Sequence, residues 1–133
     1  MLMPAAVLVM IVLGGLAVDS AVGFLAAREL SDLTAAAAND AASEALDDRA
    51  FHEGTVDGVT LHPRRAEEVV ALSIAARGSG SFTLTGVDVD VTGEEVTVRA
   101  SATVRMLFAP ALPGTPNERT VTAVSRAEAR LDG

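Results

Sequence analysis

The sequence predicts an α+β protein with a long N-terminal transmembrane helix, a short second helix and a three-stranded antiparallel β-meander. Residues 1–27 are almost entirely apolar and contain a single charged residue, Asp19. Apolar residues then recur at helical spacing, and the last third of the chain alternates apolar and polar residues. We expect residues 1–27 to be the transmembrane or assembly helix, residues 28–48 its extramembrane continuation, and residues 49–133 a small exported α+β domain.

The uncharged apolar run of residues 2–18 is about long enough to cross a bilayer as a helix. A cleaved signal peptide needs a basic leader and a shorter apolar core, and no Lys or Arg precedes this run. A buried helix of a soluble protein is the other alternative. We interpret the run as a retained single-pass anchor in the inner (cytoplasmic) membrane, with the N-terminus cytoplasmic and the C-terminal domain extracytoplasmic.

Asp19 needs an explanation because a carboxylate inside a membrane span is costly and usually has a partner or a function. One interpretation is an assembly contact with a cation or a free amino terminus of a neighbouring subunit. It predicts that Asp19→Ala weakens assembly more than insertion. The other is that the span ends near Val18 and Asp19 lies in the headgroup zone.

The helical pattern continues beyond the apolar run to about residue 48, which gives a helix from residue 4 about 65 Å long. Its small side chains suit close helix–helix packing, although an alanine-rich composition alone is the alternative. One helix face carries Leu30, Leu33, Ala37, Ala41 and Ala45. The residues expected in assembly or helix packing are Gly14, Gly15, Asp19, Arg28, Ala35, Ala38 and Ala42.

Residues 49–62 are predicted to form a loop because Gly54 and Gly58 interrupt them. A second helix is predicted from Pro63, which is favourable at a first helical position, to Arg77, which precedes Gly78.

Strict alternation over residues 96–108 and again over 120–131 predicts two half-buried strands. A third strand, residues 82–91, changes parity at Gly86, which predicts a β-bulge there. A four-residue loop of residues 92–95 would pair Val91 with Val96 and Asp88 with Arg99, and this charge pairing favours that register. Residues 109–118 are predicted to cross irregularly to the last strand, and both helices are expected to cover the apolar face.

Composition and motifs argue against chemistry. The net charge of −8 disfavours nucleic acid and anionic membrane surfaces as partners, and the chain has no cysteine for disulfides or thiolate metal sites. We found no Gly-rich phosphate loop, Cys–His arrangement or HExxH motif. A metal site at His52 and His62, or a hydrolase using Asp88 and Asp90, is disfavoured against solvated surface residues. We expect no catalysis, cofactor, metal or small-molecule substrate.

Several N-terminal features resemble TadE/TadG-like pilus-assembly proteins of the Tad (tight adherence, Flp type IVc pilus) system, in the actinobacterial type. They are Ala17-Val18-Asp19, Phe24-Leu25, Arg28-Glu29-Leu30 and the alanine-rich run 35–42 with Asn39-Asp40. The resemblance implies a pilin-like architecture and a minor-pilin or pseudopilin role without catalysis. It also implies membrane lipid and other pilin-like or assembly-platform subunits as partners, and a place in a surface pilus.

The processing of the N-terminus and an alternative function remain open. Prepilins of this system are cut after a Gly, with a Glu five residues into the mature helix. Gly14 and Gly15 lack a Glu at that spacing, so no processing is predicted there unless it occurs upstream of Met1. The alternative function is a membrane-anchored exported binding domain unrelated to pili, whose polar sheet face or loop 110–116 carries the ligand.

Overall fold

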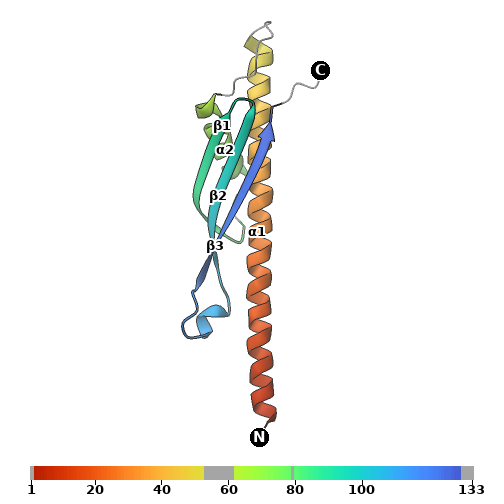
Figure 1. The fold of residues 1–133 in the computed structure, drawn as a ribbon, viewed down its shortest axis with the longest axis vertical. Helices are drawn as coiled ribbons and strands as arrows, with labels where there is room; N and C mark the ends of the chain where they lie inside the picture. Colours follow the sequence, from red (N-terminus) through yellow and green to blue (C-terminus); the bar gives the residue numbers. More distant parts are fainter. Residues whose placement is uncertain (1, 53–61, 79, 130–133) are drawn as a thin grey trace.

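The computed structural model describes residues 2–52, 62–78 and 80–129, leaving aside the side chains of 45–52. Its elements, in chain order, are helix α1 (Met3–His52), helix α2 (Pro63–Arg77), strand β1 (Thr83–Thr92), strand β2 (Glu95–Arg105), the 3-10 helix η1 (Ala109–Ala111) and strand β3 (Glu118–Glu128). The predicted α+β layout is confirmed, with a long apolar N-terminal helix, a short second helix and a three-stranded antiparallel sheet (Figure 1).

Helix α1 is unbroken and extends beyond both predicted ends. The expected loop is therefore wrong for residues 49–52, which continue the helix because no Gly or Pro interrupts the sequence before Gly54. Residues 53–61 of that loop lie outside the described residues. Helix α2 begins at Pro63 and ends at Arg77, as predicted.

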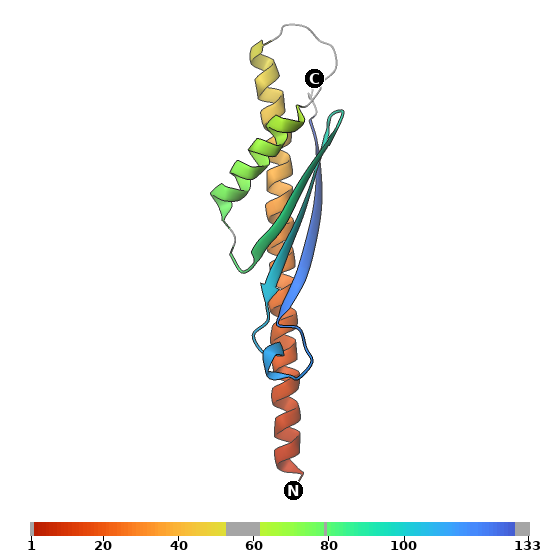
Figure 2. The same cartoon turned by 90° about the vertical axis from the view of Figure 1, so that its left-hand side faces the viewer.

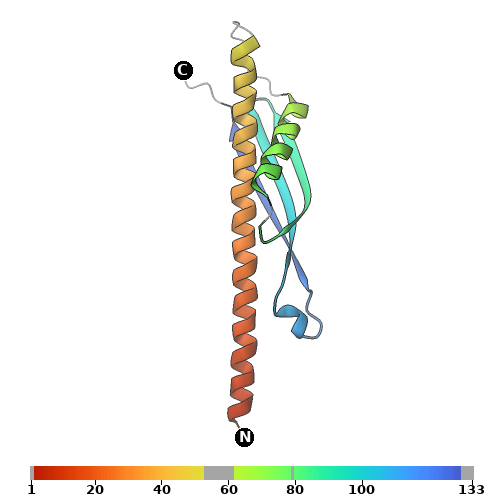
Figure 3. The same ribbon diagram turned by 180° about the vertical axis from the view of Figure 1, so that it is seen from behind.

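The sheet and α2 pack against the C-terminal half of α1, so the predicted cover of the sheet by both helices is confirmed. Figure 2 shows α2 crossing α1 obliquely, with the sheet beside them. The N-terminal part of α1 continues past the loop that contains η1, with no other described element beside it (Figure 3). The molecule is thus a rod that carries a small α+β domain on one half.

The strand order is β1-β2-β3, with both pairs antiparallel. Val91 pairs with Val96 and Asp88 pairs with Arg99, which confirms the predicted register. The ladder extends one pair further than expected, to Thr92 and Glu95, so the turn is the two-residue Gly93–Glu94 rather than a four-residue loop. Gly93 has φ of 62°, a conformation that glycine adopts without the strain of a Cβ.

The predicted bulge in β1 is also confirmed, since the register with β2 shifts between Leu84 and Gly86. The shift returns the apolar residues before and after it to the face that packs on the helices. Phe82 is buried there, and Val87 and Val89 are partly buried against the same core.

The core is a seam between the sheet and a stripe of mostly small residues on α1. Small side chains let the helix backbone approach the sheet and α2 closely, so little bulk is needed to exclude water. The α1 residues buried in this seam are Ala26, Leu30, Leu33, Thr34, Ala37, Ala38, Ala41 and Ala42. The buried β2 residues are Val96, Val98, Ala100, Ala102 and Val104, in the alternation that the sequence predicts.

Candidate functional site

The N-terminal half of α1 is a large apolar surface that its own chain leaves uncovered. Over its most apolar 18-residue window the mean hydropathy is 2.3 and only 11% of the residues are buried. A core helix of a soluble domain would be mostly buried over such a window. Among the described residues this is the one helix long and apolar enough to cross a membrane. Its exposed apolar side chains include Leu2, Met3, Val7, Leu8, Val9, Met10, Ile11, Leu13, Leu16 and Val18.

Asp19 interrupts this apolar surface, yet its side chain is only 6% exposed. Its carboxylate accepts hydrogen bonds from three consecutive backbone N–H groups of the loop between β2 and β3. The donor–acceptor distances are 2.9 Å from Leu107, 3.1 and 3.2 Å from Phe108 to the two oxygens, and 2.7 Å from Ala109. An ionised acceptor makes such bonds shorter and stronger than neutral ones. Asp19 therefore fastens the loop of residues 107–109 to α1.

This arrangement changes the interpretation of Asp19. Its partners are backbone groups of its own chain, so a docked loop leaves the carboxylate occupied rather than available to a neighbouring cation or amino terminus. Its position relative to lipid headgroups stays a prediction. The sequence signalled that a charge in an apolar run needs a partner. It carried no signal for the partner itself, which lies 88 to 90 residues away along the chain.

The two predicted glycines, Gly14 and Gly15, are adjacent in α1 but have different surroundings. A Cβ built on Gly15 would lie 3.2 Å from Cβ and Cγ of Phe108, whereas a Cβ on Gly14 would meet nothing within 4 Å. One turn beyond Asp19, Gly23 lies close to Arg119 and Met106. Gly15, Asp19 and Gly23 are spaced by four residues and so share one helix face. That face receives the loop and the adjoining strand ends.

The other predicted packing residues lie closer to the C-terminal end of α1. Ala38 and Ala42 are 0% and 5% exposed and belong to the core with α2 and the sheet. Their packing in this structure is therefore within the chain, and a contact of these residues with another subunit stays a prediction. Ala35 is half-buried and Arg28 is exposed.

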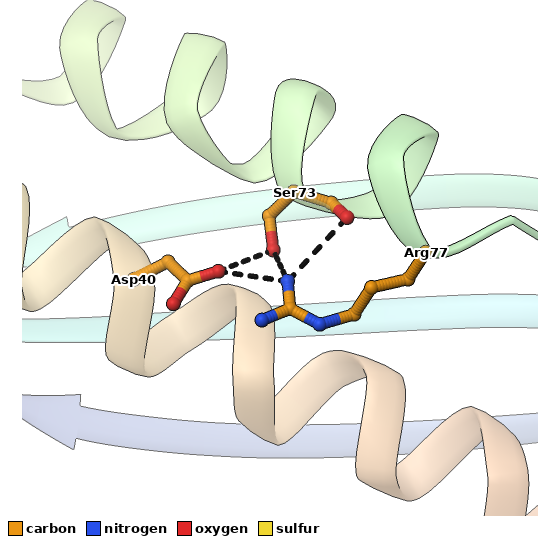
Figure 4. Close-up of polar contacts among 3 residues, drawn as sticks. All are labelled: Asp40, Ser73 and Arg77. Carbon is orange, nitrogen blue, oxygen red and sulfur yellow. Dashed lines mark hydrogen bonds and ion pairs between the residues drawn. The ribbon is translucent and has the colours of Figure 1, made fainter.

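A polar cluster of three residues, Asp40, Ser73 and Arg77, links α2 to α1, as Figure 4 shows. Oδ2 of Asp40 accepts hydrogen bonds from the Ser73 hydroxyl at 2.6 Å and from the Arg77 guanidinium at 2.8 Å. The same guanidinium nitrogen also donates to the Ser73 hydroxyl. The Ser73 hydroxyl, followed by Arg77, lowers the pKa of Asp40 below its usual value.

This pKa shift predicts acid sensitivity of the α1–α2 contact. Because the folded-state pKa is depressed, the stabilisation is present above the unfolded-state pKa of about 4 and is lost as the pH falls through the lower folded value. The side chains of Asp40 and Arg77 are each 42% exposed, so we expect less than about 1 kcal/mol. Asp40→Asn should lower unfolding free energy at pH 7 and have a shrinking effect below pH 4, as measured by denaturant titration. Asp32→Asn, at an exposed position on α1, is the control. A pH-independent difference would contradict the assignment.

The other chemistry-bearing residues do not assemble into a site. His62 is exposed, and the His52 side chain lies outside the described residues. Asp88 and Asp90 are exposed on β1, where they pair with Arg99 and Thr97. Within the described ranges, no three His, Asp or Glu side chains are grouped so that they could hold a metal ion.

No family model matches the sequence, no curated protein matches it, and no solved structure matches the fold. The candidate site is therefore defined by residues of this chain alone. It consists of the exposed apolar half of α1 and the loop that Asp19 holds against it.

Proposed function

We propose that this chain is a non-enzymatic structural or assembly component, similar to a minor pilin or pseudopilin, of a Tad-type pilus. In this proposal residues 2–18 anchor the chain in the inner membrane as a single span. The N-terminus is cytoplasmic, the α+β domain is outside, and the same helix packs against other pilin-like or platform subunits during assembly. A role in a surface pilus follows if the helix leaves the lipid.

The observation that carries the proposal is the division of α1 into two halves. In the C-terminal half, one face of α1 between Ala26 and Ala42 is buried against the sheet and α2, while the N-terminal half exposes nearly all of its large apolar side chains. Exposed apolar surface of this size marks a membrane or protein interface. A helix whose other half is rigidly attached to a domain can use that surface first in lipid and then against neighbouring helices.

Deletion of residues 2–18 tests the proposal in the native host. We expect loss of the protein from the membrane fraction and loss of pili, because the apolar surface needed for both is removed. The control is Leu72→Ser on the exposed face of α2, where Leu72 is 63% exposed, and it should leave both properties unchanged. Normal piliation of the deletion strain would exclude the proposed function.

A second candidate function is a membrane-anchored binding domain, and a groove between α2 and β1 favours it. The groove is lined by Val70, Ile74, Leu84, Val87 and Val89, with Glu67 and Asp88 among its polar residues. Crosslinking from single cysteines distinguishes the two functions, and the chain has no native cysteine to interfere. Capture of pilin or platform subunits from Ala17 and Leu25 supports pilus assembly. Capture of another protein from Leu84 alone supports the binding domain.

A further inference from the structure

The loop between β2 and β3 is uncharged over residues 106–116 and apolar except for Thr115. Met106 is buried, but the next two large side chains are not: Leu107 is 65% and Phe108 is 47% exposed. Pro110, Ala111 and Pro113 are also exposed. A loop at the end of a soluble sheet is usually polar, so this composition calls for an apolar environment.

The loop lies beside the candidate span rather than at a distant end of the domain. Phe108 contacts α1 at Gly15, four residues on the N-terminal side of Asp19, which is about 6 Å further along the helix at 1.5 Å per residue. The helix is apolar and exposed on both sides of this level, at Leu13, Leu16 and Val18. Loop and helix therefore form one continuous apolar surface, as the arrangement in Figure 3 allows.

The backbone N–H groups of this loop already meet the condition for entering lipid. Every N–H from Met106 to Pro113 either has an acceptor or is absent because the residue is proline. Leu107, Phe108 and Ala109 donate to Asp19, as described above. Met106 donates to the Asn117 carbonyl at 2.9 Å, and Ala111 and Leu112 donate to Phe108 and Ala109 carbonyls at 3.0 Å. Unsatisfied N–H groups are costly in lipid, so this internal satisfaction removes the share of the insertion cost that the loop N–H groups would contribute.

Charged residues flank the loop at the end of β2 and at the start of β3. Arg105 and Glu118 are paired at the lower end of the sheet, and Arg119 lies beside Gly23 on α1. This level is two helix turns above Gly15, or about 12 Å. The boundary between uncharged and charged residues on the loop thus lies near the boundary on α1, where Arg28 and Glu29 follow the apolar stretch.

We propose that loop 106–113 is a second membrane contact of this chain. Its tip inserts beside α1 into the headgroup–acyl boundary of the leaflet on the domain side, and lipid is its occupant. Interfacial elements of this kind bury their apolar face by about 5–10 Å, which agrees with the position of Phe108 below Asp19. The inference rests on the membrane anchoring in the proposed function and is independent of any role in pili. Asp19 positions the loop and supplies the acceptors that make it compatible with lipid.

The test uses tryptophan fluorescence, because the chain contains no Trp or Tyr. Three single variants of the full chain, Phe108→Trp, Met10→Trp and Val124→Trp, are reconstituted in phosphatidylcholine vesicles with or without bromine on the acyl chains. Val124 is the matched control, because it is 49% exposed on the outer face of β3, against 47% for Phe108. We expect brominated lipid to reduce the emission of the Met10 and Phe108 variants. The Val124 variant should not be quenched, and Phe108→Trp should respond most to shallow bromines.

The outcomes separate the two proposals. Quenching at position 10 without quenching at position 108 would overturn the membrane contact of the loop and leave the anchor intact. Absence of quenching at both positions would overturn the anchor as well. The proposal would also be overturned if brominated lipid failed to quench the Trp at position 108 only at high protein density. That result would mean that a second copy of the chain covers the loop. Leu107→Trp repeats the measurement at a 65% exposed position in case Phe108→Trp disturbs the contact with Gly15.

Discussion

Replacing Asp19 with alanine is expected to release the loop of residues 107–109 from α1. The carboxylate accepts hydrogen bonds from three backbone N–H groups, and alanine offers none of these acceptors. Donors that lose their acceptor must find water or remain unsatisfied. We expect amide hydrogen exchange at Leu107, Phe108 and Ala109 to accelerate by more than about tenfold, as measured by NMR of the full chain in micelles. Asp19→Asn should be intermediate, because an amide oxygen can replace one of the two carboxylate oxygens.

Two further variants make this prediction specific. Asp32→Ala removes an exposed carboxylate from the same helix and should leave loop exchange unchanged. Gly15→Leu should undock the loop without touching Asp19, because its Cβ would already lie 3.2 Å from Phe108. Gly14→Leu is the control for that change, since the space around Gly14 is open. Unaltered exchange of the loop amides in Asp19→Ala would show that the carboxylate does not hold the loop.

The same variant bears on assembly. If the loop is docked in the assembled protein, its release in Asp19→Ala should reduce piliation more than membrane insertion, as the sequence also predicts. The physical reason differs, because the variant would act through the position of the loop rather than through a bond to a neighbouring subunit. Equal membrane levels and equal piliation of the wild type and the variant would contradict this effect.

Leu30→Ala is expected to cause the largest loss of stability among single core changes on α1. Leu30 is 0% exposed and packs between the helix and the sheet with Ala100, Ala102 and Val104. Removing a fully buried leucine side chain leaves a cavity and costs about 2–5 kcal/mol of unfolding free energy. In a domain this small such a loss should lower the melting temperature by more than about 10 °C.

The matched control is Leu72→Ala, because Leu72 is 63% exposed on α2 and should change stability by less than about 0.5 kcal/mol. Thermal unfolding of both full-length variants in the same micelles, followed by circular dichroism, measures the difference. Similar melting temperatures for the two variants would mean that the helix–sheet seam is not the core that stabilises the domain.

Most of the fold could be predicted because the local periodicity of apolar and polar residues indicates each element. The alternation over β2 reports one buried and one exposed face, and the parity change at Gly86 reports the bulge. Pro63 and Gly78 bound α2 through their own backbone preferences. The predicted end of α1 was wrong by four residues. The sequence near residue 48 contains no Gly or Pro to stop the helix, so its end could not be located from local pattern alone.

The candidate site was predictable only in part. The apolar run and the oddity of Asp19 are visible in the sequence, but the loop that meets them is not. Residues 109–118 were expected to be an irregular crossing because their prolines exclude regular structure. Nothing in their local pattern indicates that the preceding amides converge on a carboxylate of the first helix.

By itself, the sequence determined the existence and type of each main element, the register between β1 and β2, and the apolar character of residues 2–18. These properties depend on neighbours within a few positions, through side-chain period, charge and backbone preference. The predicted strand 96–108 was too long, because β2 ends at Arg105. Only the tertiary structure decided that Ala38 and Ala42 are buried in the core of this chain. It alone decided that Gly15 receives Phe108 and that Asp19 binds the loop. Those outcomes depend on which surfaces meet after the chain folds back along α1. The local sequence around a small residue or a single charge is the same whether that residue ends up buried or exposed, so it cannot indicate the partner.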